Sequence, residues 1–263
     1  MKEILLAVRH SRWLKFIALP LVLIVAYQLW ASSAQSPFFP TVGVIAVAFV
    51  ETWGGDGFVE NVVPSLTNLA VGYISGVILG LVLGVLLSRM TVVRIAVMPI
   101  VSFLLALPAV ALVPLFITVA GIGPAMSQSI IAFAVTLYVL VNTVDGLVKV
   151  DSGLVDVNHV FRIRGWRQIL LVLLPSIAPR LLGAGRAALS LSILIMVVSE
   201  MVGASAGIGA VTLLSQQSFQ YSTMWAGMVM VAVLGIGLNA LYLMFERPML
   251  RRSGISPMAR TIK

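Results

Sequence analysis

The chain has 263 residues, 60% of them hydrophobic and only 10% charged, and its mean hydropathy is +1.09. This composition excludes an ordinary water-soluble domain and predicts an integral membrane protein. The net charge of +8 is explained by a bias of Lys and Arg toward one side of a membrane and by contact with membrane lipids. It gives no support to nucleic-acid binding. The chain contains no cysteine, which excludes a disulfide framework and a thiolate site.

Long apolar stretches follow one another along the chain. A transmembrane helix needs about twenty predominantly apolar residues, and we count about six such stretches. They lie near residues 13–31, 62–88, 95–119, 125–148, 177–200 and 223–245. The first is longer than the core of a cleaved signal peptide, so we expect it to remain as a helix. Prolines interrupt the third and fourth, which membrane helices tolerate where neighbouring helices satisfy the freed carbonyl groups.

Two shorter apolar segments and one glycine repeat lie between and within these spans. Residues 36–53 are too short to cross, and we expect them to lie along the outer interface. Residues 204–221 predict a re-entrant or surface helix. In the second span a glycine recurs every four residues, which predicts a helix face that a neighbouring backbone approaches closely. The four glycines are Gly72, Gly76, Gly80 and Gly84.

The distribution of basic residues predicts the orientation. None of the 17 Lys and Arg lies in residues 32–61, 120–124 or 201–222. Because positive charges near span ends stay in the cytoplasm, these segments are expected outside and both termini inside. We therefore predict a multi-pass protein of the cytoplasmic (inner) membrane. We expect it to form a single transmembrane domain over residues 1–263, with a core of about 62–246 and a cytoplasmic loop of about 149–176.

The longest polar interruption, residues 149–180, lies on the predicted inner side. Its pattern predicts two short amphipathic helices that are joined at Gly165 and end at Leu174 and Pro175. Apolar residues at spacings of three or four would give the first helix one apolar face, formed by Leu154, Val157 and Phe161. Such a face can insert into a groove on a soluble partner. It can also lie flat on the inner leaflet, and the sequence leaves both interpretations open.

The order of residues in this loop is similar to that of a known family. Asp156, Val157 and Asn158 stand where the family carries a Glu-Ala-Ala triplet, and Trp166 and then Pro175 follow. This resembles the EAA loop of ABC importer permeases. Segments 108–123, 199–209 and 245–252 are similar in order and spacing to the taurine, alkanesulfonate and nitrate branch. The chain departs from that pattern at Arg162, where glycine is usual, and at Asn68, where arginine is frequent.

The resemblance implies an all-α, polytopic membrane helical bundle of about six transmembrane helices with a cytoplasmic coupling-helix loop, as in type I ABC importer permeases. It also implies a small solute as cargo, such as a sulfonate or nitrate. The implied partners are a second copy of the chain, two ABC ATPase subunits and a periplasmic or lipid-anchored substrate-binding protein. The residues it assigns to ATPase coupling are Leu154, Asp156, Val157, Asn158, Phe161, Arg162, Arg164, Gly165, Trp166 and Pro175.

The sequence predicts no catalytic residue, cofactor or metal. It lacks the G-x-x-x-x-G-K-[ST] phosphate loop, so ATP must be bound by another polypeptide. His10 and His159 stand alone, without Cys, Asp or Glu at ligand spacing. Glu200, near the outer end of the fifth span, either lines the pathway or hydrogen-bonds the glycine-rich turn that follows it. Ser65 and Asn68 are further candidates for polar lining of the pathway.

Two other transport functions remain as alternatives. A stand-alone secondary transporter would need ionisable relays near the midplane, and the nearly charge-free spans disfavour one. A channel remains possible, because backbone carbonyl groups can line a pore without any charge.

Two arginines lie within the fifth predicted span. We expect Arg180 and Arg186 to snorkel or to pair within the bundle.

Overall fold

Every regular element of the described residues is a helix. The computed structural model describes residues 12–150, 153, 161, 163 and 165–252. The α-helices are α2 (Arg12–Ala34), α3 (Val42–Trp53), α4 (Val63–Arg89), α5 (Thr91–Ala106), α6 (Val113–Ala120), α7 (Pro124–Val148), α9 (Trp166–Gln168), α10 (Leu174–Gly203), α11 (Ile208–Gln217) and α12 (Tyr221–Arg252). Shorter helical turns are the π-helices η1 (Phe58–Val62) and η3 (Ile169–Leu173) and the 3₁₀-helix η2 (Ala109–Leu112). The predicted all-α class is confirmed.

Four helices are long and apolar enough to cross a membrane, and a bent pair makes a fifth candidate. The four are Phe58–Arg89, Pro124–Val148, Trp166–Gly203 and Tyr221–Leu250. The apolar part of α2, Ala18–Ala34, is shorter than these four helices. The short apolar helices expected within residues 36–53 and 204–221 are present as α3 and α11.

The third predicted span, residues 95–119, is not one continuous helix. It consists of Thr91–Ala106 and Ala109–Ala120, which meet at an angle of 93°. Leu107, which precedes Pro108, has the extended backbone (φ −74°, ψ 128°) that a following proline favours. The predicted interruption by proline is therefore a break between two helices, because Pro108 ends α5.

The second helix of the inner loop does not end where the sequence predicts. We expected its second helix to end at Leu174 and Pro175, but Trp166–Gly203 is one continuous helix. Pro175 lies in the first turn of α10, directly after the π-helical turn η3. The same arrangement occurs at Pro64, in the first turn of α4 directly after the π-helical turn η1. A wider turn accommodates a residue that has no N–H and whose ring crowds the preceding carbonyl groups.

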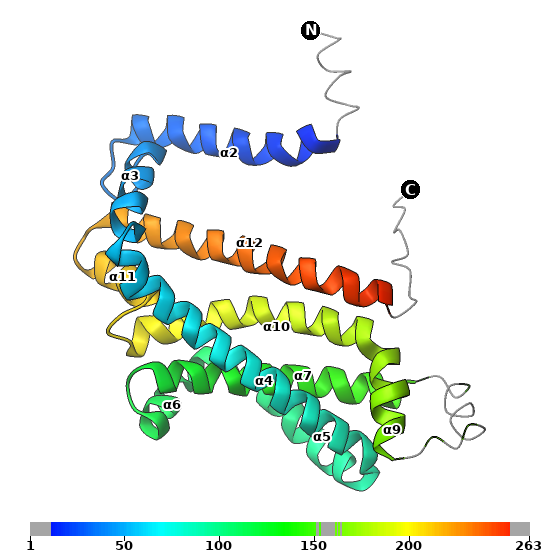
Figure 1. Ribbon diagram of the computed structural model, residues 1–263. Helices are drawn as coiled ribbons and strands as arrows, with labels where there is room; N and C mark the ends of the chain where they lie inside the picture. Colours follow the sequence, from blue (N-terminus) through cyan, green and yellow to red (C-terminus); the bar gives the residue numbers. More distant parts are fainter. Residues whose placement is uncertain (1–11, 151–152, 154–160, 162, 164, 253–263) are drawn as a thin grey trace.

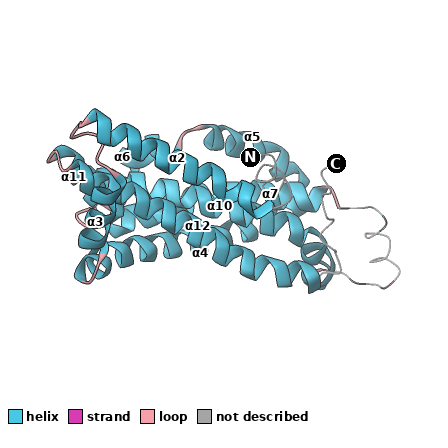
Figure 2. Ribbon diagram, turned by 90° about the horizontal axis from the view of Figure 1, so that it is seen from above, coloured by secondary structure: helices cyan, strands magenta, loops and turns pink. Residues whose placement is uncertain are grey.

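The bundle is organised around α7. Helices α7, α10 and α12 run side by side, with α4 packed along α7 (Figures 1 and 2). The glycines of α4 face Ile131, Val135, Val139 and Thr143 of α7, and a Cβ added at any of them would come within 2.6–2.8 Å of one of those side chains. The predicted close approach of two backbones is confirmed.

The two ends of the bundle carry different parts of the chain. Helices α3, α6 and α11 gather at one end, and α9 lies at the other (Figure 1). This separation matches the division of the sequence into segments without Lys or Arg and a segment rich in them. The two ends therefore present different candidate sites.

Candidate functional site

The loop that the sequence assigns to coupling adjoins α9, at the end of the bundle that the sequence predicts to be cytoplasmic; we call this the inner end and the opposite end the outer end. Of its ten predicted residues the structure describes Phe161, Gly165, Trp166 and Pro175. Six lie outside the described residues: Leu154, Asp156, Val157, Asn158, Arg162 and Arg164. Phe161 and Trp166 are 71% and 63% exposed, which is high for large apolar side chains. Two aromatic side chains are thus available to a partner at this end.

Gly165 fixes the point at which the loop joins the bundle. Its backbone has φ 66° and ψ −137°, a conformation that residues with a Cβ rarely adopt. Its carbonyl oxygen accepts a hydrogen bond from Arg89 Nη2 at 3.4 Å. Arg89 is in the last turn of α4. The junction is therefore attached to α4 as well as to the helix that begins at Trp166.

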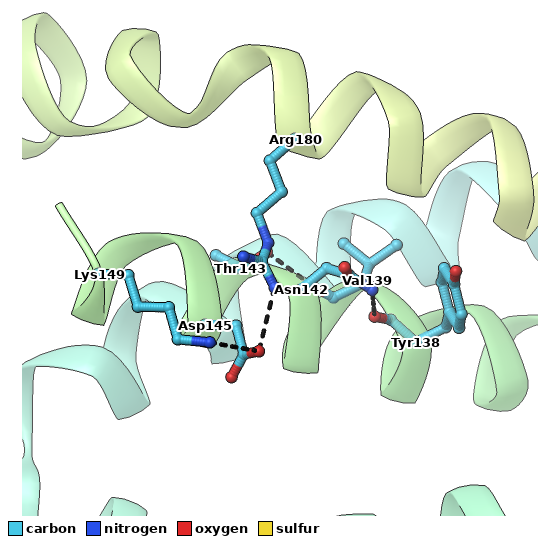
Figure 3. A network of polar contacts seen from close by, with 7 residues as sticks. All are labelled: Tyr138, Val139, Asn142, Thr143, Asp145, Lys149 and Arg180. Atoms are coloured by element: carbon cyan, nitrogen blue, oxygen red, sulfur yellow. Dashed lines mark hydrogen bonds and ion pairs between the residues drawn. The ribbon is translucent and has the colours of Figure 1, made fainter.

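A three-residue ion network ties α7 to α10 at the same end (Figure 3). Arg180 Nη2 of α10 lies 3.0 Å from Asp145 Oδ2 of α7, and Lys149 Nζ lies 3.6 Å from the same oxygen. The Asp145 and Arg180 side chains are 39% and 40% exposed. Arg180 thus pairs within the bundle, as expected for a charged residue near the inner end of a span.

The outer end contains a buried polar cluster that includes all three predicted pathway residues. Ser65 and Asn68 of α4 and Glu200 of α10 are buried. Ser65 Oγ donates to Glu200 Oε2 at 2.9 Å, and Asn68 lies beside the same carboxylate. The Asn68 Oδ1 atom accepts a hydrogen bond from Gln128 Nε2 of α7 at 3.0 Å. Four polar side chains thus join three helices within the apolar core.

This cluster also satisfies the start of α11. Gly207, the N-cap residue, has φ 128°, a conformation that favours glycine. The Ile208 N–H donates to Ser65 Oγ at 3.0 Å, and the Gly209 N–H donates to Glu200 Oε2 at 3.1 Å. A carboxylate at a helix N-terminus is favourable because free N–H groups and the helix dipole both attract it. Glu200 therefore hydrogen-bonds the glycine-rich turn, which is one of the two roles expected for it.

Two members of the cluster were missed by sequence reasoning. Asn61 Oδ1 accepts a hydrogen bond from the Gly207 N–H at 3.2 Å, and Gln128 bonds Asn68. Asn61, Ser65 and Asn68 are spaced by four and then three residues, so they share one face of the helix that begins at Phe58. That spacing was a usable signal. Gln128 gave no signal of its own, because its partner is distant in sequence.

At both ends the polar side chains hold neighbouring segments of the chain together. Among the described residues, no group of three or more His, Cys, Asp and Glu side chains could hold a metal ion. The inner network fixes the root of an exposed loop, and the outer cluster fixes a short helix.

Comparison with known proteins settles the family. The sequence profile of the family described as "binding-protein-dependent transport system inner membrane component" matches residues 76–251, more than half of the chain. The chain belongs to this family. As a member, it is a multi-pass membrane protein that serves as the permease subunit of an ABC transporter for import of a small solute. The match includes α7, the inner loop and α10.

Individual relatives agree with this assignment. SsuC of Bacillus subtilis, described as an aliphatic sulfonates transport permease protein, is 28% identical over 241 residues, 91% of this chain and 87% of that protein. RibX of Chloroflexus aurantiacus, a riboflavin transport system permease protein, is 26% identical over 59% of this chain and 58% of its own length. An inward-facing structure of the MetNI methionine ABC transporter matches with a TM-score of 0.62 and 21% identity, covering 73% of this chain and 94% of that chain. This structural match confirms the permease fold.

Proposed function

We propose that this chain is the permease of an ATP-driven importer in which two copies enclose one solute pathway. Each copy binds one ABC ATPase subunit through the loop of residues 149–176, and a separate binding protein delivers the solute. The observation that carries this proposal is the pair of exposed aromatic side chains, Phe161 and Trp166, at the end of the bundle where Gly165 is attached. A membrane subunit without a phosphate loop needs such a contact to receive energy from a partner.

The connections around the loop support transmission of force. Gly165 is bonded to α4 through Arg89, and Asp145 and Arg180 join α7 to α10. A push on the loop would therefore displace three helices together. Rigid-body movement of packed helices between two arrangements is a common mechanism of transport cycles. Closure of the ATPase pair would turn the permease from an inward-facing to an outward-facing state.

The polar cluster at the outer end would transmit this movement to α11. Helix α10 has 30 residues and is therefore about 45 Å long. Near its far end, Glu200 holds the start of α11. Ser65 and Asn68 hold the same region from α4. We assign these three residues to the outer part of the translocation pathway, where they position α11 as a gate.

Several further properties belong to the same proposal. Both termini face the cytoplasm, and α3 and α11 face the binding protein on the outside. The remaining coupling residues predicted from the sequence act within the loop: Leu154, Asp156, Val157, Asn158, Arg162, Arg164 and Pro175. Residues 1–263 act as one permease domain with a core of about 62–246. The chain itself catalyses no reaction and needs no cofactor.

The cargo is a small organic anion, and a sulfonate fits best. The relative SsuC is described as a transporter of aliphatic sulfonates and matches over 91% of this chain. Permeases for a different solute also match, as RibX does, over a smaller part of the chain. The breadth of the SsuC match favours a sulfonate over the other small solutes transported by relatives.

Copurification with the ATPase tests the proposal. Replacing residues 155–165 with a Gly-Ser segment of equal length removes Val157 and Phe161 from the apolar face and keeps the chain connected. We expect the variant to insert into the membrane and to lose the ATPase during purification. Phe219→Ala is the matched control, because Phe219 is also highly exposed but lies near the other end, between α11 and α12. Copurification that survives the replacement would refute coupling through this loop.

A further inference from the structure

An open groove lies between α10 and α12 within the membrane-spanning part of the bundle. Its volume is about 540 Å³, and it is lined by Gly183, Arg186, Ala187, Ser190, Asn239 and Leu243. On α10 the lining residues recur at spacings of three or four and form one exposed face of small and polar side chains. The exposed faces of α2 and α4 are different, since they carry mainly large apolar side chains such as Leu23 and Ile78.

The groove lies at mid-span. Arg186 is about 18 Å along the helix from the start of α10 and about 26 Å from its end at Gly203. Asn239 of α12 lies at the same depth, because its Nδ2 donates to Ser190 Oγ at 3.2 Å. Charged side chains at such depth are expensive in lipid and are found facing protein or a water-filled cavity. The groove is therefore not a lipid-facing surface.

The polar groups of the groove are arranged as hydrogen-bond donors. Arg186 Nη1 lies 3.8 Å from Glu246 Oε2, too far for a hydrogen bond, and the Arg186 side chain is 48% exposed. Ser190 Oγ accepts the bond from Asn239, and its own bond to the Arg186 carbonyl is long, at 3.5 Å. The guanidinium N–H groups and the Ser190 hydroxyl proton are thus available to an acceptor. Glu246 lies close enough to balance part of the charge of Arg186.

We propose that this groove is a binding station on the solute pathway, where Arg186 and Ser190 bind the anionic oxygens of a small sulfonate or carboxylate. This inference rests on the proposed importer function and adds a site to it. Guanidinium groups bind such oxygens strongly, because the hydrogen bonds are charge-assisted and two can form in parallel. Asn239 is a positioning residue that holds the Ser190 oxygen and directs its proton toward the groove.

Single-cysteine labelling tests the station directly, because the chain has no cysteine of its own. Ala187→Cys places a thiol in the groove and leaves the proposed binding groups intact. The probes are sulfonatoethyl methanethiosulfonate, an anion, and trimethylammonioethyl methanethiosulfonate, a cation. The labelling rate of each probe is divided by the rate at which the same probe reacts with a small thiol in solution, which corrects for the different reactivities of the two probes. In the assembled complex we expect the anion to react about tenfold faster than the cation, because Arg186 concentrates anions locally.

The controls separate the groove from its surroundings. Arg186→Gln in the Ala187→Cys background should abolish the preference for the anionic probe, and ethanesulfonate should slow labelling of Ala187→Cys. Leu23→Cys, on the apolar exposed face of α2, should react with neither probe. Ala187→Cys that is as inert as Leu23→Cys would mean that a second copy covers the groove. That result, or a preference for the cation, would overturn the proposal.

Transport gives an independent readout. Arg186→Gln should raise the KM for ethanesulfonate uptake at least tenfold, the loss expected for a hydrogen bond to a charged group. Arg247→Gln, which also removes one positive charge from an exposed position near the end of α12, should leave the KM unchanged. Both variants should keep the ATPase during purification. An Arg186→Gln variant with normal KM would overturn the station and leave the importer function standing, whereas a wild-type chain that never retains an ATPase would overturn the function itself.

Discussion

Ser65 of α4 donates a hydrogen bond to the carboxylate of Glu200 in α10 at 2.9 Å, although 135 positions separate the two residues in the sequence. Both side chains are completely buried. The Ser65 oxygen and the Glu200 carboxylate also accept the Ile208 and Gly209 N–H groups, respectively, at the start of α11. One pair of side chains thus joins two spans to the short helix at the outer end.

Removal of the Glu200 carboxylate should destabilise the protein. Glu200→Ala leaves the Gly209 N–H without its acceptor in the core, whereas the Ser65 hydroxyl can still donate to the Asn61 carbonyl. An unsatisfied buried donor costs about 1–3 kcal/mol, which corresponds to a fall of roughly 2–10 °C in Tm for a chain of this size. Thermal unfolding of the purified protein in detergent measures the change.

Two further variants make this test specific. Glu200→Gln keeps an acceptor oxygen, so its Tm should fall less than that of Glu200→Ala. Thr67→Ala on the exposed side of α4 removes only a bond to the carbonyl of Val63 in the same helix, and its Tm should stay within about 1–2 °C of wild type. If Glu200→Ala and Thr67→Ala lowered the Tm equally, the buried cluster would contribute no more to stability than an exposed hydrogen bond within one helix.

The sequence predicted the class and the glycine face, because each depends on a local pattern. Composition identifies lipid as the solvent, and a spacing of four residues identifies one face of a helix. The partners of these faces could not be predicted. Nothing local in the sequence says that Ser65 meets Glu200 or that Asp145 meets Arg180. Such pairs depend on which helices are neighbours in the bundle.

The different effects of two prolines also have a local cause. Prolines were expected both to interrupt spans without breaking them and to end the inner loop. At Pro108 the chain turns by 93° between the flanking helices, and at Pro175 it continues as a helix. The difference lies in what precedes the proline, an extended residue in one case and a π-helical turn in the other. Hydropathy carries no information on that choice.

The contact between α4 and α7 predicts that added volume will not be tolerated. In Gly80→Ala the new Cβ would lie 2.8 Å from both the Thr136 carbonyl oxygen and Val139 Cβ, which belong to the rigid part of α7. Overpacking of this kind costs about 1–3 kcal/mol. We expect a lower Tm and less folded protein in the membrane fraction.

Gly237→Ala is the control for the glycine contact. A Cβ at Gly237 of α12 meets no atom within 4 Å, so the substitution adds the same methyl group to an open helix position. Its Tm should be unchanged or slightly higher, because alanine favours the helix by about 1 kcal/mol over glycine. If both substitutions lowered the Tm equally, the approach of α4 to α7 would not be the cause.

The ion pair between Asp145 and Arg180 should affect coupling more than stability. Both side chains are partly exposed, so the pair contributes about 1 kcal/mol at most. Asp145→Asn should therefore leave Tm nearly unchanged while reducing solute-stimulated ATP hydrolysis by the assembled complex. The exchanged double variant, Asp145→Arg with Arg180→Asp, should recover part of that stimulation. A double variant no better than its two parents would argue against a direct role of the pair.

Gly165 provides the most local test of the coupling loop. Its backbone, with φ 66° and ψ −137°, is strained by about 1–3 kcal/mol for any residue that has a Cβ. Since no atom of the described residues lies within 4 Å of an added Cβ, Gly165→Ala changes the backbone preference without a clash among them. The junction should move, and the ATPase should dissociate faster from the purified complex. Gly43→Ala in α3 adds a methyl group to an equally open position with ordinary helical backbone, so it should retain the ATPase as wild type does. If Gly165→Ala held the ATPase equally well, the geometry of this junction would not govern the contact.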